Sequence, residues 1–337
     1  MEDNKKLLEI KDLKVSFFTP AGEVKAVDGI SYDLGYNEVM GIVGESGSGK
    51  SVEAYSVIGL LQSPGKVTGG SITFEGEDLL SFDEKKMMTV RGNDISMIFQ
   101  NPMTCLNPVY TVGNQLMEAL TCHDSTISKA AARKRAIEML ELVGINNADK
   151  RVDQYPHEFS GGMRQRAMIA MALICSPKLL IADEPTTALD VTIQAQILEL
   201  MKELQKKTNM SIIFITHNLG VVAEVCDRVS VMYAGHIVEQ GKVDEIFCSP
   251  QHPYTKGLLA SMPRLDELSH ERLVPIEGTP VDLLDPPKGC CFGPRCQSCM
   301  KICLTKKPPM IQFGYGDHSS ACWLHVLNML DDRKEGI

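Results

Sequence analysis

The sequence predicts an α/β fold with a mixed sheet at its core, an antiparallel β-subdomain, a helical subdomain and a small cysteine-rich C-terminal extension. Three observations predict it. Strand-length apolar runs alternate with helix-length segments in residues 179–233, as in a parallel sheet covered by helices. The apolar run 39–43 leads directly into a glycine-rich loop. Beyond Pro250, proline and cysteine become frequent and the hydrophobic periodicity fades.

The N-terminal region predicts the β-subdomain. Residues 7–18 and 24–34 alternate between apolar and polar side chains, and residues 19–22 between them form a turn signal. The later elements are expected in this order: a helix over 51–61, a turn-rich stretch over 63–70, a strand over 71–74, mostly helix over 111–176, strands near 179–183, 211–216 and 229–233, helices near 191–207 and 218–226, and a turn with a short edge strand over 235–241.

The domain boundary is predicted from the rise in proline and cysteine and the loss of hydrophobic periodicity beyond Pro250. We expect residues 1–250 to form one domain, with a helical subdomain over about 101–176, and residues 251–337 to form the C-terminal extension. Within the helical part, Ser128 can cap a helix over 128–143 and Gly144 can end it.

The glycine-rich loop fits the pattern G-x-x-x-x-G-K-[ST]. Its residues are Gly44, Glu45, Ser46, Gly47, Ser48, Gly49, Lys50 and Ser51. Glycines let backbone N–H groups turn inward around the β-phosphate of a nucleotide. Lysine in this place reaches the β- and γ-phosphates, and the serine hydroxyl is a ligand for Mg²⁺. A surface loop that carries a lysine by chance would not account for the apolar strand before it and the helix-forming run after it.

Four further segments carry polar groups that suit a protein that binds and hydrolyses a nucleotide. One apolar strand ends in Asp183 and Glu184, and because consecutive strand residues point to opposite faces, the first can face Mg²⁺ and the second an attacking water. The Ser-Gly-Gly at 160–162 precedes a helix and predicts an anion-binding N-terminus. His217 and Gln100 each follow an apolar strand. Taken singly, each feature also suits an ordinary strand end, helix cap or loop.

In this order and at these separations, the segments resemble the ATP-binding subunit of an ABC transporter. The matching motifs are Walker A at 44–51, the Q-loop at Gln100, the ABC signature at 160–164 with Met163 where Gln is commonest, Walker B at 179–184, the D-loop at 188–190 and the switch histidine at His217. The resemblance covers essentially the whole chain. It implies a phosphate-loop (RecA-like) mixed-sheet core, the antiparallel β-subdomain and a helical ABC signature subdomain.

Three segments, two of which include or adjoin these motifs, resemble dipeptide, oligopeptide and nickel importers. They are residues 99–108, 155–166 and 252–255, with Cys105 where Ser is usual. The resemblance implies an ATPase subunit that powers import of di- or oligopeptides. Import of nickel or glutathione, powered by the same kind of ATPase subunit, is the nearest alternative, because nothing in this subunit touches the cargo. A non-transport ABC ATPase is the alternative from another class, although such chains usually carry coiled coils or tandem ATPase domains.

The resemblance also implies the role of each motif residue. The residues implied to contact ATP are Phe17, Gly44, Glu45, Ser46, Gly47, Ser48, Gly49, Lys50, Ser51, Ser160, Gly161, Gly162 and Asp190. Those implied to hold Mg²⁺ are Ser51, Gln100 and Asp183, and those implied to act in catalysis are Glu184, His217 and Gln100. Phe18 is the alternative to Phe17 for the aromatic ring against adenine, and either can be a core residue.

Partners follow from the same resemblance. It implies a second, related ATPase subunit that closes two shared ATP sites head to tail, two integral membrane permeases, and an extracytoplasmic substrate-binding protein that acts through the permeases. The chain is therefore expected at the cytoplasmic face of the plasma (inner) membrane, as a peripheral protein. Residues 1–6 are charged and predict no secretory signal, and no apolar run reaches the ~18 residues of a membrane helix.

Composition fits this picture. The chain has 337 residues, 44% of them hydrophobic and 23% charged, as in a globular protein. Its formal net charge of −9 argues against a nucleic-acid partner, because readers of nucleic acid are basic.

Eleven cysteines are many for a reducing compartment, where disulfides are rare. Six lie after residue 289, at Cys290, Cys291, Cys296, Cys299, Cys303 and Cys322. Four thiolates can hold Zn²⁺ or a [4Fe–4S] cluster, and free thiols are the third interpretation. The resemblance to peptide importers implies a [4Fe–4S] cluster on Cys290, Cys296, Cys303 and Cys322, with the other two as extras that leave the choice of ligands open.

Overall fold

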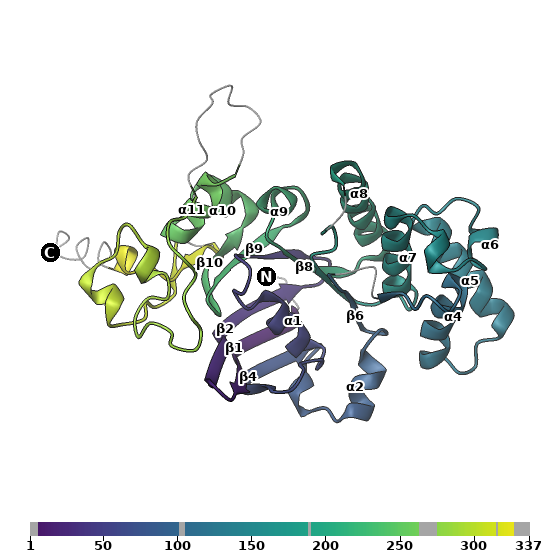
Figure 1. Cartoon of the computed structure of the whole chain (residues 1–337), viewed down its shortest axis with the longest axis horizontal. Helices are drawn as coiled ribbons and strands as arrows, with labels where there is room; N and C mark the ends of the chain where they lie inside the picture. The colour runs from purple at the N-terminus through teal and green to yellow at the C-terminus, as the bar shows by residue number, and fades with distance from the viewer. Residues whose placement is uncertain (1–5, 101–104, 188–189, 263–274, 315, 327–337) are drawn as a thin grey trace, which may run out of the picture. The chain divides into compact units, whose positions relative to one another are not determined.

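A computed structural model describes residues 6–100, 105–187, 190–262, 275–314 and 316–326 (Figure 1). The described chain divides into two compact units. Unit 1 contains Leu34–Val39 and Leu79–Ile215 together with Lys6 and Leu7. Unit 2 contains Leu8–Asp33, Met40–Asp78 and the described residues from Thr216 onward.

Unit 1 combines parallel strands with a group of helices. Its strands are β6 (Ile95–Ile98), β7 (Leu179–Asp183) and β8 (Ser211–Thr216), and its helices are α2 (Glu84–Val90), α4 (Val112–His123), α5 (Lys129–Leu142), α6 (Ala148–Arg151), α7 (Gly161–Leu173) and α8 (Val191–Thr208). β7 pairs in parallel with β6 on one side and β8 on the other. Every residue of β7 and β8 is buried, which explains why both strands are almost continuously apolar.

The helices α4, α5, α6 and α7 lie together in Figure 1 and form the predicted helical subdomain. Helices α4 and α5 begin at side-chain caps: Thr111 accepts a hydrogen bond from the backbone N–H of Asn114, and Ser128 accepts one from the backbone N–H of Ala131. Gly113 allows close packing, since a Cβ there would lie 2.3 Å from a methyl group of Val152.

The first sheet of unit 2 is the predicted β-subdomain. Its strands are β1 (Lys6–Thr19), β2 (Gly22–Gly35), β4 (Gly65–Phe74) and β5 (Glu77–Asp78), in the order β2-β1-β4-β5. The expected turn over 63–70 is wrong in part, because β4 already begins at Gly65, where it pairs with Phe17 of β1. Antiparallel pairing with β1 thus overrides the weak strand propensity of the glycines in this stretch.

The second sheet of unit 2 contains the strand that leads into the glycine-rich loop. Its strands run in the order β11-β12-β10-β9-β3, namely β11 (Ile311–Gln312), β12 (Ser319–Ser320), β10 (His236–Lys242), β9 (Arg228–Tyr233) and β3 (Val39–Val43). β3 and β9 are parallel, whereas the other pairs are antiparallel. The prediction that 235–241 forms an edge strand is wrong, because the short strand β12 pairs with β10 on its outer side.

Helices α1 (Lys50–Val57), α9 (Leu219–Val225), α10 (Val243–Cys248) and α11 (Pro253–Ala260) complete unit 2. Its core joins β3, β9 and β10 to α9, α10 and α11, and it includes Phe292 of the C-terminal extension. The extension therefore shares this core through Phe292.

The α/β class and the architecture predicted from the sequence are confirmed. Within the described ranges, no helix is both long enough and apolar enough to cross a bilayer.

Candidate functional site

The glycine-rich loop of unit 2 is a tight backbone turn between β3 and α1. Gly49 has a φ of 102°, and a Cβ there would lie 2.4 Å from the carbonyl oxygen of Ala26. A Cβ on Gly44 would lie 2.1 Å from the carbonyl oxygen of Met232. Both positions therefore require glycine, and they bring the loop's backbone close to the strands beside it.

Lys50 is the first residue of α1 and is buried under the loop. Its ammonium group donates hydrogen bonds to the carbonyl oxygens of Gly44 and Glu45, both at 2.8 Å. Ser51 follows it in the first turn of the helix, where backbone N–H groups attract anions. The helix spans Lys50–Val57 and is therefore shorter than the expected 51–61. It ends early because the chain turns where the backbone N–H of Leu60 donates to the carbonyl oxygen of Tyr55.

Two residues far along the chain contact Glu45 of this loop. The hydroxyl of Tyr254 accepts a hydrogen bond of 2.9 Å from the backbone N–H of Glu45. Arg295 makes a bidentate ion pair with the Glu45 carboxylate, at 2.7 and 3.1 Å. Tyr254 belongs to the singled-out segment 252–255, but no sequence signal connects Arg295 with a loop 250 residues earlier.

In unit 1, Gln100 and Glu184 lie in direct contact. The side-chain amide of Gln100 donates a hydrogen bond of 2.9 Å to Oε2 of Glu184, and the hydroxyl of Thr187 donates another of 2.8 Å to the same atom. Glu184 has a φ of 46°, which is rare for a residue with a side chain and often marks a functional position. Asp183 precedes it at the buried end of β7. Sequence reasoning did not identify Thr187.

The segment 160–164 and Asp190, the last residue of the predicted D-loop, also lie side by side. Ser160 caps α7 by accepting from the N–H of Met163, and both Ser160 and Gly161 are exposed. Asp190 caps α8 by accepting from the N–H of Ile193. A Cβ on Gly162 would lie 3.1 Å from a methyl group of Ile193, so the two helix N-termini are close neighbours. Residues 188–189 lie outside the described residues.

The remaining predicted residues are His217 and Phe17. His217 is exposed directly after β8. Phe17 is half-buried in β1, with its ring near Gly65, whereas Phe18 is 48% exposed. The phosphate loop, Phe17 and His217 belong to unit 2, whereas Gln100, Asp183, Glu184 and the signature belong to unit 1.

The cysteines of the extension gather in one place. Cys303 and Cys322 are buried, and Cys290 and Cys296 are half-buried. Each of Cys296 and Cys322 lies within electrostatic reach of Cys290 and Cys303. Burial raises the pKa of Cys322 to about 11. Even so, no group of three or more His, Cys, Asp or Glu among the described side chains is arranged to hold a metal ion.

The two extra cysteines lie in the same group of thiols, because Cys291 is hydrogen-bonded to Cys290 and Cys299 lies beside Cys303. The thiol of Cys291 points to the carbonyl oxygen of Tyr233, at 3.8 Å, and Cys299 is exposed with its thiol 3.7 Å from its neighbour's carbonyl oxygen.

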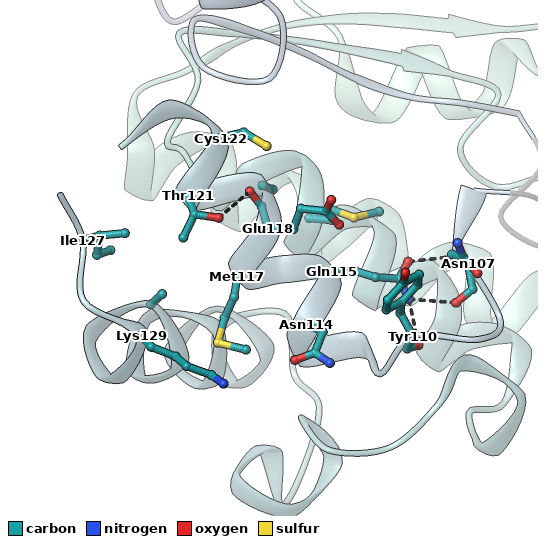
Figure 2. A pocket seen from close by; sticks show the side chains of 13 residues that line it. Asn107, Tyr110, Asn114, Gln115, Met117, Glu118, Thr121, Cys122, Ile127 and Lys129 are labelled. Carbon is teal, nitrogen blue, oxygen red and sulfur yellow. Dashed lines mark hydrogen bonds between the residues drawn. The ribbon is translucent and has the colours of Figure 1, made fainter. Parts of the chain in front are cut away.

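A second feature of unit 1 is a pocket of about 850 Å³ on the helical subdomain (Figure 2). It is lined by residues of α4, by Lys129 and Ala132 of α5, by Met171 of α7, and by Asn107 and Tyr110 before α4. Gln115 ties this segment to α4, because its amide donates to the carbonyl oxygens of Asn107 and Tyr110, both at 3.0 Å.

Two family models match the chain. Residues 27–187 match the model described as "ABC transporter", and residues 238–303 match the model described as "Oligopeptide/dipeptide transporter, C-terminal region". The second match includes α11, Arg295 and five of the six clustered cysteines.

Curated relatives match over almost the whole chain. The oligopeptide transport ATP-binding protein OppD of Bacillus subtilis (strain 168) is 60% identical over 95% of this chain and 89% of its own length. The dipeptide transport ATP-binding protein DppD of the same organism is 58% identical over 95% of each chain. OppD of Salmonella typhimurium is 53% identical, over 96% of this chain and 95% of its own.

Solved structures match the fold. The ATP-binding cassette MJ0796, in a dimeric post-hydrolysis state bound to ADP and Pi, superimposes with a TM-score of 0.63 at 26% identity, over 70% of this chain and 98% of that chain. The protein cbiO1 from Clostridium perfringens, part of the transporter complex cbiONQ, has a TM-score of 0.63 at 29% identity, over 73% and 92% of the two chains.

Proposed function

Because the chain belongs to the family of oligopeptide and dipeptide transport ATP-binding proteins, the ATPase subunits of ABC transporters, we propose that its hydrolysis of ATP powers the import of di- or oligopeptides. The observation that carries the proposal is the loop 44–51, whose backbone turn requires glycine at Gly44 and Gly49 and places Lys50 at the start of α1. Peptide cargo is supported by the match to the C-terminal region of peptide transporters.

The loop would bind the phosphates of ATP. Lys50 would exchange its bonds to the loop carbonyls for the β- and γ-phosphates, and the N–H groups of the loop and of the first turn of α1 would hold the remaining oxygens. Phe17 would pack against adenine, since its ring is half-buried beside Gly65. Mg²⁺, held by Ser51, Gln100 and Asp183, would neutralise phosphate charge.

Glu184 would polarise the attacking water. Two donors, Gln100 and Thr187, orient its carboxylate and thereby aim one oxygen. The exposed His217 would contact the γ-phosphate and stabilise the charge that develops during hydrolysis.

The site would be completed by a second, related ATPase subunit. Ser160 and Gly161 are exposed at the N-terminus of α7, a place where N–H groups and the helix dipole attract an anion. Asp190 and Gly162 lie next to them and would contact the same partner. The dimeric state of the similar cassette MJ0796 supports this arrangement.

The pocket on the helical subdomain would receive a short helix of a membrane permease (Figure 2). Its floor combines apolar atoms of Met117, Ile127 and Met171, which suit the apolar side of a docking helix. Two permeases would hold the chain at the cytoplasmic face of the plasma (inner) membrane as a peripheral subunit, and an extracytoplasmic binding protein would deliver cargo to them.

The gathered thiols would hold a [4Fe–4S] cluster on Cys290, Cys296, Cys303 and Cys322. Support comes from the mutual proximity of these thiols, which Cys291 and Cys299 share. Since they are not arranged as a preformed site, the thiols would have to move together as the metal binds. Bound there, a cluster would cross-link the extension.

Transport assays test the cargo. Cells that lack the chain should take up labelled di- and oligopeptides much more slowly, and uptake should return with the wild-type chain but not with its Lys50→Ala variant. Peptide uptake that is unchanged, with loss of nickel or glutathione uptake instead, would contradict the peptide assignment. Co-purification from membranes with two hydrophobic proteins would support the permease partners, whereas recovery of nucleic acid would contradict them.

A further inference from the structure

The phosphate loop is held from outside by the C-terminal extension. Arg295 donates from Nη1 to Oε2 of Glu45 at 2.7 Å and from Nη2 to Oε1 at 3.1 Å. The Arg295 side chain is 5% exposed and that of Glu45 is 26% exposed. A bidentate pair between guanidinium and carboxylate is both directional and stronger than a neutral hydrogen bond, so this contact fixes the direction of the Glu45 side chain.

Arg295 is itself rigidly held. Its Nε donates to the carbonyl oxygen of Glu277 at 3.0 Å, its Nη2 to that of Ile276 at 3.3 Å, and its Nη1 to the hydroxyl of Tyr233 at 3.4 Å. The guanidinium carbon also lies 5.7 Å from the centre of the Tyr233 ring. Because all three guanidinium nitrogens have partners within unit 2, the Arg295 side chain is held in one orientation. Its ion pair in turn holds the side chain of Glu45.

A second contact holds the backbone of the same residue. The hydroxyl of Tyr254 accepts from the N–H of Glu45, and the ring of Tyr254 is fully buried between Tyr233 and Phe292, with ring centres 4.7 and 5.3 Å away. Burial raises the pKa of Tyr254, so its hydroxyl remains neutral. The side chain and the backbone of Glu45 are therefore both attached to the rigid aromatic core of unit 2.

The charge of Glu45 matters as much as its position. Its carboxylate belongs to the loop that would surround the phosphates, and a negative charge near a triphosphate is unfavourable unless a cation balances it. Arg295 supplies that cation from a side chain with little exposure to water, where screening is weaker.

We propose that Arg295 is a positioning residue for ATP binding, which acts through Glu45 by fixing the phosphate loop and by balancing the charge beside it. The proposal rests on the proposed role of the loop as the ATP site. The extension is then part of the nucleotide site through Arg295.

Nucleotide titration of the full chain tests this directly. Arg295→Gln should weaken binding of ATP and of ADP about tenfold each, the loss expected for one charge-assisted pair. The two losses should be equal because both nucleotides carry the β-phosphate that the loop binds. In the steady state KM for ATP should rise with kcat nearly unchanged, since Arg295 does not act on the reacting atoms.

A double variant separates positioning from a merely structural role. Glu45→Gln removes the charge that needs balance and keeps a side-chain oxygen that can accept from Arg295, so it should lose less ATP affinity than Arg295→Gln does. Added to Arg295→Gln, it should restore most of the lost affinity, because no unpaired carboxylate then remains beside the phosphates. The proposal is overturned if Arg295→Gln binds like the wild type, or if the double variant binds as weakly as Arg295→Gln or more weakly.

Two controls accompany the test. Arg133 makes another bidentate ion pair on the surface of unit 1, from Nη1 and Nη2 to the two carboxylate oxygens of Asp153, both at 2.6 Å. Arg133→Gln removes this pair and should leave ATP affinity unchanged. If Arg295→Gln does not fold, Arg295→Lys carries the test: it keeps the cation with a single contact and should lose about threefold in affinity, and full affinity would overturn the proposal.

Lys50→Ala separates the role of the loop as the ATP site from the role of Arg295 as a positioning residue. If it abolishes nucleotide binding while Arg295→Gln binds normally, only the role of Arg295 is wrong. If Lys50→Ala still binds normally, the loop is not the ATP site and both proposals fall.

Discussion

The amide of Gln100 donates a hydrogen bond of 2.9 Å to the carboxylate of Glu184, although 84 residues separate them in the chain. Gln100 follows β6 and Glu184 follows β7, and these strands are parallel neighbours. Their carboxyl ends therefore deliver both side chains to the same edge of the sheet, where Thr187 adds a second donor. This contact joins the proposed Mg²⁺ ligand to the proposed base before any nucleotide takes part.

Glu184→Gln should lower ATP turnover by about a hundredfold or more, because an amide cannot accept a proton from the attacking water. ATP-driven dimerisation should survive, since the amide preserves the shape of the side chain. Steady-state phosphate release and size-exclusion chromatography with ATP measure the two effects. Glu199→Gln, on the exposed side of α8, is the matched control and should change neither. Turnover at the wild-type rate in Glu184→Gln would refute the role of this residue as base.

Lys50→Ala should abolish nucleotide binding, because the loop then loses the cation that would reach the β- and γ-phosphates. A fluorescent-nucleotide titration measures the loss. Lys85→Ala removes a lysine from the exposed side of α2 and should bind as the wild type does. Similar nucleotide affinities for the two variants would show that the charge of Lys50 does not contribute to nucleotide binding.

Ser160→Asn should lower turnover at least about tenfold while nucleotide binding by the isolated chain remains normal. Asparagine preserves the cap of α7, since it is as good an N-cap as serine, but its larger side chain would obstruct a phosphate held by the partner subunit. Ser128→Asn makes the same change at the cap of α5 and should be neutral. If both variants turn over ATP normally, Ser160 does not face a shared nucleotide.

Protein purified without oxygen should be brown and carry about four iron atoms per chain. Cys303→Ser, at a buried thiol among the proposed ligands, should lose the colour and most of the iron, whereas Cys299→Ser should keep both because that thiol is exposed. Visible absorption and iron analysis measure the outcome. Colourless protein that contains zinc would contradict the iron assignment, and colourless protein without metal would support free thiols.

Met117→Glu should weaken co-purification of the chain with its permeases and leave nucleotide binding by the isolated chain unchanged. The side chain lines the pocket of the helical subdomain, where a carboxylate would oppose the docking of an apolar helix. Met88→Glu, at a residue of α2 that is 62% exposed, is the control and should leave assembly intact. Equal assembly of both variants with the permeases would exclude this pocket as the docking site.

Local sequence patterns were sufficient for much of this molecule. The motif residues at 44–51 and 160–162 and the strands β7 and β8 are encoded within short segments, because periodicity, glycine placement and helix caps act over a few residues. The α/β class and the helical subdomain followed from these patterns and are confirmed. Errors fell where distant pairing decides: β4 starts at Gly65 because β1 lies beside it, and β10 is not an edge because β12 pairs with it.

The tertiary structure alone decided which side chains meet. No local rule connects Arg295 with Glu45 or Tyr254 with the same loop, since each contact joins segments more than two hundred residues apart through the shared core of unit 2. The sequence shows six cysteines after residue 289, and only the folded chain shows that Cys291 and Cys299 lie in the same group of thiols as the other four. The physical reason is the same in both cases: long-range contacts depend on how buried surfaces pack, and that packing is a property of the whole chain.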